Sequence, residues 1–197
     1  MKPSSAEMRQ HILDTARPII AGKGFAAVGI NEILAAAAIP KGSFYYYFAS
    51  KDQFGEALLD SYFVEYMAQL NRILFHPSGT AAERLISYWQ AWEETQNTRN
   101  REFMCLAVKL GGEVSDLSEA MREALRKGTT LIMERIAACI AEGVADQSIP
   151  ATVEPTQTSV QLYELWIGAS LLEKIHRDGH LFAIAFASTR QILHLPV

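Results

Sequence analysis

The sequence predicts an all-α protein with about nine helices. Apolar residues recur at spacings of three and four along almost the whole chain, which is the pattern of helices with one buried face. The segments between these runs hold helix-capping residues, glycine or proline, and the sequence shows no strand-like alternation, internal repeat or low-complexity tract. The chain has 197 residues, 49% of them hydrophobic, so it can bury a sizeable core and is not expected to be disordered.

The first part of the chain is expected to hold three helices. The first begins at a capping box formed by Ser4 and Glu7 and stops at "GKG", residues 22–24, with Pro18 expected to kink it. The second covers about Ile30–Ala37, and a short turn leads to a third helix around "SFYYYF". A longer helix followed by two short ones joined by a tight turn is a helix-turn-helix arrangement.

The third helix carries three tyrosines in a row, Tyr45, Tyr46 and Tyr47. Consecutive helical positions are about 100° apart, so these three side chains cannot share one buried face. Phe44 and Phe48 are four residues apart and do share a face. We therefore expect the phenylalanines to anchor the helix and the tyrosines to point outward, either as solvated surface rings or because they contact a partner.

Six further helices are expected after residue 50. Two of them begin at capping boxes, one formed by Ser50 with Gln53 and one by Thr80 with Glu83. A short helix is expected to end at the glycine pair 111–112, and "DQSIPATVEPT" reads as a loop. The expected helices start at Ser50, Thr80 and Phe103, and then cover about Leu117–Val144, Thr156–Arg177 and Leu181–Leu195.

Charge is distributed unevenly along the chain, whose formal net charge is −4. Residues 1–51 hold six basic and three acidic side chains, a net charge of +3, whereas the remainder holds twelve basic and nineteen acidic ones, a net charge of −7. This asymmetry indicates a polyanion-binding head on an acidic body. The start of the chain has no secretory signal and no run of about 18 apolar residues occurs, so a cytoplasmic protein with free thiols is expected.

The stretch "GFAAVGINEILAAAAIPKGSFYYYFASKDQF" resembles the DNA-binding domain of TetR/AcrR-family regulators, over about residues 9–55. The resemblance implies a helix-turn-helix domain over residues 1–50 whose third helix enters the major groove, and a helical sensing and dimerisation domain over residues 51–197. The family usually has glycine where this chain has Ala38, and alanine in a left-handed conformation would cost about 1 kcal/mol. Either the turn has another shape here or the strain is tolerated.

The residues themselves fit contact with DNA. Lys41 and Ser43 can donate to bases or phosphates, and Gly42 allows close approach of the backbone. Lys51 begins the next helix, where a phosphate would meet both its ammonium and the helix N-terminus. The tyrosines combine flat apolar rings with hydroxyl donors. The candidate DNA-contacting residues are Asn31, Lys41, Gly42, Ser43, Tyr45, Tyr46, Tyr47 and Lys51, Asn31 by analogy with the family.

Two segments of the body, "CLAVKLGGEVSDLSEAMREALRKG" and "LYELWIGASLLEKI", resemble the electrophile-responsive repressors of the same family. With them the resemblance extends over nearly the whole chain. It implies control of genes that detoxify reactive electrophiles such as quinones or aldehydes, and release from DNA when a thiol is modified. The residue that matches the reactive cysteine is Cys105.

Cys105 also has features of a reactive thiol on its own. It lies near the start of a short helix, where the positive end of the helix dipole favours a thiolate, and Lys109 is one turn further on the same face. Arg99 and Arg101 precede it, and Lys174 on a later helix is a further candidate neighbour. The alternative is a buried, inert cysteine, which is the commonest state of a free cysteine.

Large apolar side chains of the body predict either a ligand cavity between helices or an ordinary packed core, since both use the same residue types. Cys139 follows two isoleucines at helical spacing and is expected in the core. The five histidines are scattered, so neither a metal site nor a cofactor is predicted. The candidate sensing residues are Cys105, Lys109, Trp89, Trp92, Phe103, Tyr163, Trp166 and Lys174; Met104, Met121 and Met133 are further candidates for the lining of a cavity.

The predicted function is a DNA-binding transcriptional repressor that a small molecule or an electrophile releases from its operator. In TetR-like proteins the last two helices form a dimer interface, and a homodimer is what a palindromic operator needs. The alternatives are a reversible ligand without cysteine chemistry, a helical module that binds protein, and a thiol-dependent enzyme. No nucleophile elbow, nucleotide-binding loop or oriented acid–base pair supports the enzyme, so catalysis is not expected.

Overall fold

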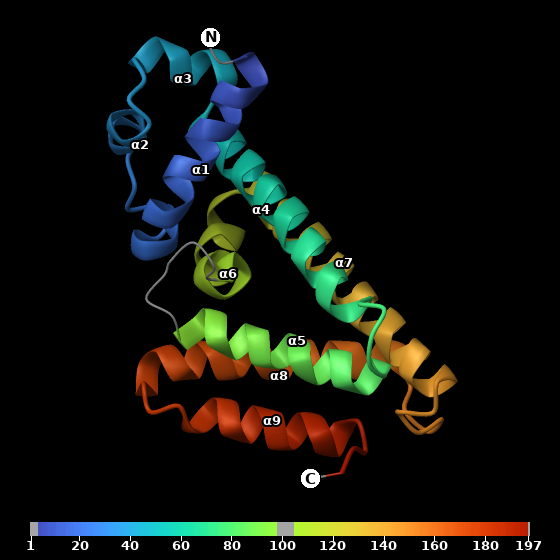
Figure 1. Ribbon diagram of the computed structural model, residues 1–197. Coiled ribbons are helices and arrows are strands. Elements are labelled where there is room, and N and C mark those ends of the chain that lie inside the picture. Colours follow the sequence, from blue (N-terminus) through green and yellow to red (C-terminus); the bar gives the residue numbers. More distant parts are fainter. Residues whose placement is uncertain (1–3, 98–104, 197) are drawn as a thin grey trace. The chain divides into compact units, whose positions relative to one another are not determined.

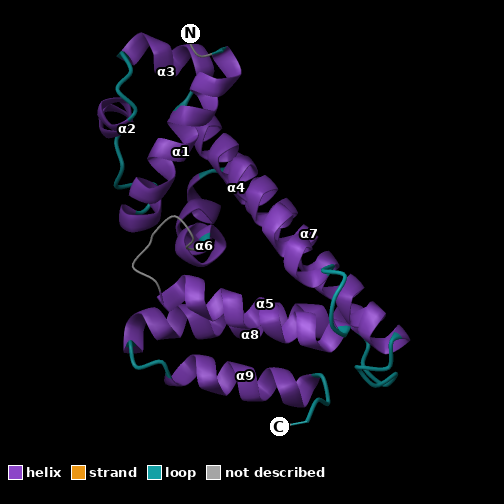
Figure 2. Cartoon of the chain, viewed as in Figure 1, coloured by secondary structure: helices purple, strands orange, loops and turns teal. Residues whose placement is uncertain are grey.

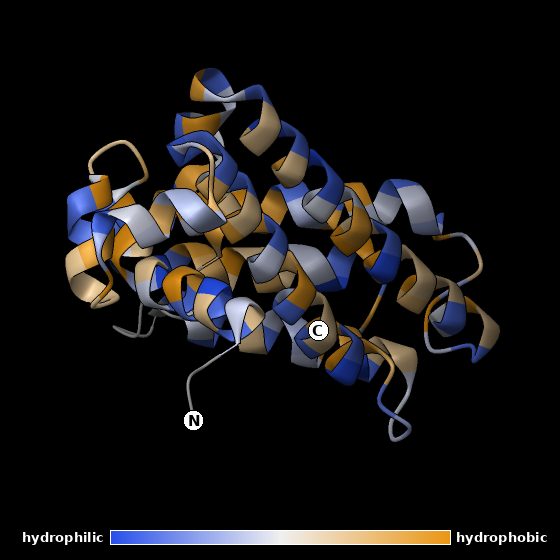
Figure 3. Ribbon diagram, turned by 90° about the horizontal axis from the view of Figure 1, so that it is seen from above, coloured by the Kyte–Doolittle hydropathy of each residue, from blue (hydrophilic) through white to orange (hydrophobic). Residues whose placement is uncertain are grey.

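The computed structural model describes residues 4–97 and 105–196, and in these ranges the chain forms nine α-helices and no strand (Figures 1 and 2). The predicted fold class is thus confirmed. Blue and orange residues alternate along the helices in Figure 3, as expected for helices with one buried face. The helices are α1 (Ser5–Lys23), α2 (Ile30–Ala36), α3 (Lys41–Tyr47), α4 (Lys51–Leu74), α5 (Ala81–Asn97), α6 (Leu106–Leu117), α7 (Glu119–Ala145), α8 (Pro155–His176) and α9 (His180–Ile192).

These helices belong to two compact units. The first unit comprises α1, α2, α3, α4 as far as Val64, α6, and α7 as far as Gly128. The second comprises the remainder of α4 and α7 together with α5, α8 and α9. None of the helices in the described ranges is long and apolar enough to cross a membrane.

Hydrogen bonds at the helix starts confirm two of the three predicted capping boxes. At the third, the Gln53 N–H donates to Ser50 Oγ at 3.1 Å, but the Gln53 side chain accepts from the N–H of Ala49 and not from that of Ser50. The backbone N–H of Glu7 donates to Ser4 Oγ at 3.2 Å, and the N–H of Ser4 donates back to the Glu7 carboxylate at 2.7 Å. Thr80 and Glu83 exchange the corresponding pair of bonds, at 3.3 and 2.8 Å. These bonds satisfy N–H groups that a helix start leaves without partners, so the sequence pattern sets where these helices begin.

The predicted end of the sixth helix is wrong, because α6 continues through Gly111 and Gly112 to Leu117. Neither glycine adopts the left-handed conformation that ends a helix. Each costs about 1 kcal/mol relative to alanine inside a helix, but buried Leu110 and Val114 on either side hold the segment in place. Helix α1 continues past its internal Pro18, and the kink expected there stays a prediction.

Ala38 lies in the turn between α2 and α3 and has a φ of 52°, the left-handed conformation that glycine usually occupies. Its N–H donates to the Ala35 carbonyl at 3.3 Å, and the next N–H, of Ile39, donates to the Leu34 carbonyl at 3.1 Å. The turn therefore keeps the shape that the family pattern implies. Of the two alternatives raised by the sequence, strain that is tolerated is the one observed.

Replacing Ala38 by glycine should raise the free energy of unfolding by a few tenths of a kcal/mol up to about 1 kcal/mol. Relief of the left-handed strain of roughly 1–2 kcal/mol outweighs the entropy of about 0.4–1 kcal/mol that glycine adds to the unfolded chain. The matched control is Ala35→Gly, an exposed helical position where the same change should lower stability. Urea denaturation at one fixed protein concentration measures both, and a destabilised Ala38→Gly variant would contradict the strain argument.

Candidate DNA-binding helices and sensing residues

Three phenylalanines pack together at the buried side of helix α3. Phe44, Phe48 and Phe54 are buried and form a triangle with ring centroids 5.2–5.5 Å apart. Within the head, α1 also packs against α2, and α2 against α3. The expected anchoring role of Phe44 and Phe48 is therefore confirmed, although Phe48 follows α3 as its C-cap residue, and this role fixes which side of α3 faces outward.

The outward side of α3 carries the tyrosines. Tyr46 is 75% exposed and Tyr45 49% exposed, whereas Tyr47 is partly buried and meets the edge of Tyr46 at a centroid distance of 4.9 Å. Lys41 at the start of the helix is exposed, as is Asn31 in the first turn of α2. An exposed large ring beside a cation is a surface suited to a flat, negatively charged partner.

The first turn of α3 also places the two smaller candidates. Gly42 is exposed and Ser43 is half-buried. No atom lies within 4 Å of where a Cβ on Gly42 would be, so packing inside the chain does not require glycine there. A need for glycine at this position would come from the close approach of another molecule.

Lys51 makes contacts that the sequence did not predict. Its ammonium donates to the carbonyl of Phe25 at 2.9 Å and to that of Ala26 at 3.4 Å, and lies 4.7 Å from the centre of the Phe25 ring. In this structure Lys51 therefore holds the turn that joins α1 to α2. The N-terminus of α4 beside Lys51 still lies at the surface of the head, because Asp52 and Gln53 in its first turn are exposed.

Glu113 is a residue that sequence reasoning missed. Its carboxylate accepts from the backbone N–H groups of Phe25 at 3.2 Å and Ala26 at 2.6 Å, which are 88 and 87 residues away in the chain. A partner at that separation leaves no signal in local periodicity. The mistaken helix end at the preceding glycine pair also removed Glu113 from the expected helix.

Cys105 is the N-cap residue of α6 and is only 2% exposed, so the burial raised as an alternative is observed, whereas the reactivity of the thiol stays a prediction. Its carbonyl accepts from the N–H of Lys109 at 3.1 Å, and the Lys109 ammonium lies 3.5 Å from the Gly22 carbonyl at the end of α1. Cys105 and Lys109 thus both lie in the first unit, at the start of a helix that contacts the head. The candidates Arg99, Arg101, Phe103 and Met104 lie outside the described residues.

The aromatic candidates belong to the second unit and pack against one another. Trp89 and Trp166 are stacked, with ring planes 7° apart and centroids 4.9 Å apart, and Trp92 meets Tyr163 edge-on at 6.0 Å. The indole N–H of Trp92 donates to Ser170 Oγ at 2.8 Å. The structure thus brings the four aromatic candidates together on α5 and α8, and half-buried Lys174 lies on α8 as well.

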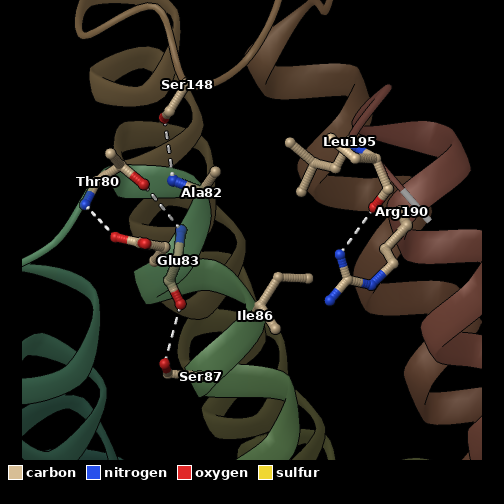
Figure 4. A pocket seen from close by; sticks show the side chains of 9 residues that line it. Thr80, Ala82, Glu83, Ile86, Ser87, Ser148, Arg190 and Leu195 are labelled. Atoms are coloured by element: carbon tan, nitrogen blue, oxygen red, sulfur yellow. Dashed lines mark hydrogen bonds between the residues drawn. The ribbon is translucent and has the colours of Figure 1, made fainter.

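A pocket of about 400 Å³ also lies in the second unit (Figure 4). Its polar groups bind one another: Arg190 donates to the Pro196 carbonyl at 2.9 Å, and Ser148 accepts from the Ala82 N–H at 3.2 Å. None of the predicted sensing residues lines it, and over the described ranges no three His, Cys, Asp or Glu side chains gather as metal ligands. The pocket is lined by Thr80, Ala82, Glu83, Ile86, Ser87, Ser148, Arg190, Leu195 and Pro196.

The second cysteine, Cys139, is fully buried, as predicted. Its thiol lies 3.5 Å from the Leu74 carbonyl and 3.7 Å from that of Ala81, and burial raises its pKa to about 12. At a pH of about 8, only about 1 thiol in 10⁴ would then be ionised. Cys139 is therefore unsuited to react with electrophiles while the protein is folded.

A Cys105→Ser variant should consequently take up no N-ethylmaleimide in the folded state and one equivalent after unfolding in urea. Intact-mass measurement counts the adducts, because the variant retains Cys139 as its only thiol. Labelling of the folded variant as fast as of the unfolded one would show that Cys139 is accessible. That result would contradict the burial described above.

Comparison with known proteins adds to this geometry. The family model described as "Bacterial regulatory proteins, tetR family" matches residues 12–58, and "Tetracyclin repressor-like, C-terminal domain" matches residues 81–189. The HTH-type transcriptional repressor NemR of Escherichia coli K12 is 34% identical over 195 residues, 99% of this chain and 98% of the relative. The repressor DhaR of Mycobacterium sp. GP1 is 30% identical over 171 residues, 87% of this chain and 84% of the relative.

Solved structures agree with these matches. The crystal structure of E. coli NemR in its reduced form superposes with a TM-score of 0.89 at 35% identity and covers 96% of this chain and 98% of that one. The regulatory protein TetR from Rhodobacter sphaeroides gives a TM-score of 0.84 at 27% identity and covers 93% and 97% of the two chains.

Proposed function

Because the chain belongs to the TetR family of bacterial regulatory proteins and is a transcriptional repressor, we propose that it binds a palindromic operator as a homodimer and leaves it when a small molecule or electrophile reacts or binds. The observation that carries the DNA-binding part is the surface of α3. There Lys41 and Tyr46 are exposed while buried phenylalanines fix the opposite side of the same helix. A rigid helix that presents a cation and aromatic rings is suited to the major groove.

In this proposal the residues of the head have separate roles. The ammonium of Lys41 binds a phosphate or a guanine edge. The Tyr46 and Tyr47 hydroxyl groups donate to phosphates, and their rings contact thymine methyl groups. Asn31, at the start of α2, contacts the sugar–phosphate backbone of the DNA. The exposed protein backbone at Gly42 allows α3 to approach the DNA closely. Ser43 and Tyr45 extend the same surface, and Lys51 adds positive charge at its edge.

The homodimer is supported by apolar residues on α8 and α9, two helices of the second unit that pack side by side (Figure 1). Leu171, Leu172, Ile175 and Ile184 are 45–67% exposed. Large exposed apolar side chains gathered on two adjacent helices favour a protein interface. A two-fold dimer also supplies two heads for the two half-sites of an operator.

Changing Lys41 to alanine should weaken operator binding several-fold and make it less sensitive to salt. If each of the two Lys41 side chains in the homodimer neutralises one phosphate, the slope of log K against log salt concentration should fall in magnitude by about 1.8. Fluorescence anisotropy on DNA from upstream of the protein's own gene measures both quantities. The control is Lys127→Ala, which removes an exposed cation from α7; a slope that the two variants change equally would argue against the role of Lys41.

For the signal, we favour covalent modification of Cys105. In a reaction with N-ethylmaleimide, the thiolate sulfur forms a bond to one alkene carbon, and the other alkene carbon takes a proton from water. The adduct adds volume to a side chain that is only 2% exposed at the N-cap of α6. The start of α6 must then move, because a packed interior does not accommodate a group of that size.

The test is operator binding before and after N-ethylmaleimide, alongside Cys105→Ser. Tight binding that the reagent abolishes in the parent but leaves intact in the serine variant is the expected result. Tight binding that the reagent does not change in the parent would exclude the thiol switch, and loss of binding in both proteins would assign the effect to another group.

A second candidate signal is a reversibly bound apolar ligand. The observation that favours it is the environment of the Trp89 indole. Its indole N–H is fully buried and has no hydrogen-bond acceptor among the described residues. Such a donor would gain a bond from a carbonyl-bearing ligand beside the stacked tryptophans. This signal would persist in Cys105→Ser, which distinguishes it from the first.

A further inference from the structure

The turn between α1 and α2 is bound by side chains of two other helices. Glu113 of α6 accepts from the N–H groups of Phe25 and Ala26, while Lys51 of α4 donates to the carbonyls of the same two residues. The bonds from N–H to carboxylate and from ammonium to carbonyl are charge-assisted, so they are stronger than bonds between neutral groups. The turn that positions α2, and through it α3, therefore depends on where Glu113 lies.

Glu113 shares one face of α6 with Cys105 and Lys109. The three residues are four positions apart, so each is displaced by only about 40° around the helix from the one before. Lys109 reaches the Gly22 carbonyl at the end of α1, and Glu113 reaches the turn that follows it. One face of α6 thus begins at the candidate sensing thiol and contacts the head at two successive points.

The contact at Glu113 is close. Gly24, which ends α1, has a φ of 93°, and a Cβ at that position would lie 2.8 Å from Glu113 Oε2. The carboxylate is therefore packed directly against the backbone of the turn. A shift of α6 cannot leave the turn in place without breaking both bonds to Glu113.

We propose that Glu113 is the positioning residue that transmits a displacement of α6 at Cys105 to the helix-turn-helix. The proposal rests on the function proposed above, in which modification of Cys105 lowers operator affinity. Helix α6 acts as the rigid element, since all three residues lie within its first nine positions counted from the N-cap. The coupling is the ratio of operator dissociation constants with and without the modification.

A purely structural role for Glu113 makes a different prediction. If the carboxylate only stabilises the turn, its removal changes operator affinity equally for modified and unmodified protein, and the ratio is unchanged. If it transmits the displacement, its removal brings the ratio toward one. The ratio, and not the affinity, therefore separates the two roles.

The experiment measures operator dissociation constants by anisotropy before and after N-ethylmaleimide in four proteins: the parent, Glu113→Ala, Glu113→Gln and Asp116→Ala. We expect a ratio of about tenfold or more for the parent and within about threefold of one for Glu113→Ala. Glu113→Gln retains one acceptor oxygen and should be intermediate. Asp116 is an exposed carboxylate on the same helix, so its alanine variant should keep the parent's ratio.

The outcomes separate this proposal from the function on which it rests. A parent-like ratio in Glu113→Ala overturns the role of Glu113 while the thiol switch stands. A parent whose affinity the reagent does not change overturns both. If circular dichroism shows Glu113→Ala to be unfolded at the assay temperature, the Glu113→Gln ratio decides: a parent-like value overturns the proposal, and a value nearer one supports it.

Discussion

Replacing Trp166 by alanine is expected to lower the free energy of unfolding by about 3–5 kcal/mol. The side chain is fully buried, stacks on Trp89 at 4.9 Å and meets Phe186 edge-on at 4.8 Å. Its loss leaves a cavity between helices of the second unit that neighbouring rings cannot fill without leaving their own contacts. Urea denaturation followed by circular dichroism, at one fixed protein concentration, measures the change.

The hydrogen bond of Trp166 provides the control. Its indole N–H donates to Thr189 Oγ1 at 2.9 Å, so Thr189→Val keeps the shape but leaves a buried donor without an acceptor. That variant should lose about 1–3 kcal/mol, less than Trp166→Ala. A loss below about 1 kcal/mol for Trp166→Ala would mean that the aromatic cluster is loosely packed and closer to a cavity than to a core.

The second large effect is expected at Gly128, where alanine should lower the free energy of unfolding by about 1–3 kcal/mol. A Cβ at this position of α7 would lie 2.3 Å from three atoms of the Phe63 ring, which is itself buried. Alanine gains about 1 kcal/mol of helix propensity over glycine, but displacing a packed ring costs more than that gain. The net effect is therefore destabilising.

Gly112 is the matched control for this substitution. It is also a helical glycine, yet no atom lies within 4 Å of where its Cβ would be. Gly112→Ala should raise the free energy of unfolding by up to about 1 kcal/mol, the opposite sign from Gly128→Ala. Equal signs for the two variants would show that helix propensity, and not the contact with Phe63, decides the outcome.

Features of the head that depend on neighbours in sequence were predictable. The capping boxes use residues three apart, and the separation of buried Phe44 from exposed Tyr46 follows from the angle between successive helical positions. The left-handed conformation of Ala38 is also one of the two turn shapes that the sequence allows at this position. In each case the physical cause acts within one or two turns of helix.

Features that depend on distant packing were not predictable. Local propensity ends a helix at the glycine pair 111–112, but burial of the leucine and valine on either side outweighs it. The bonds of Glu113 join residues 88 and 87 positions apart, and the lysine at position 51 is bound to backbone carbonyls of the same turn. For the tryptophans, composition could not separate a packed core from a cavity.

The positions of the tryptophans determine which part of the molecule intrinsic fluorescence can monitor. The chain has three, Trp89, Trp92 and Trp166, and all lie on α5 and α8 of the second unit. Indole emission is therefore blind to the helix-turn-helix, whereas circular dichroism records helices of both units. If the head unfolds separately, tryptophan emission stays constant while the ellipticity falls. Comparing the two unfolding curves of the unmodified protein therefore tests whether its two units unfold together.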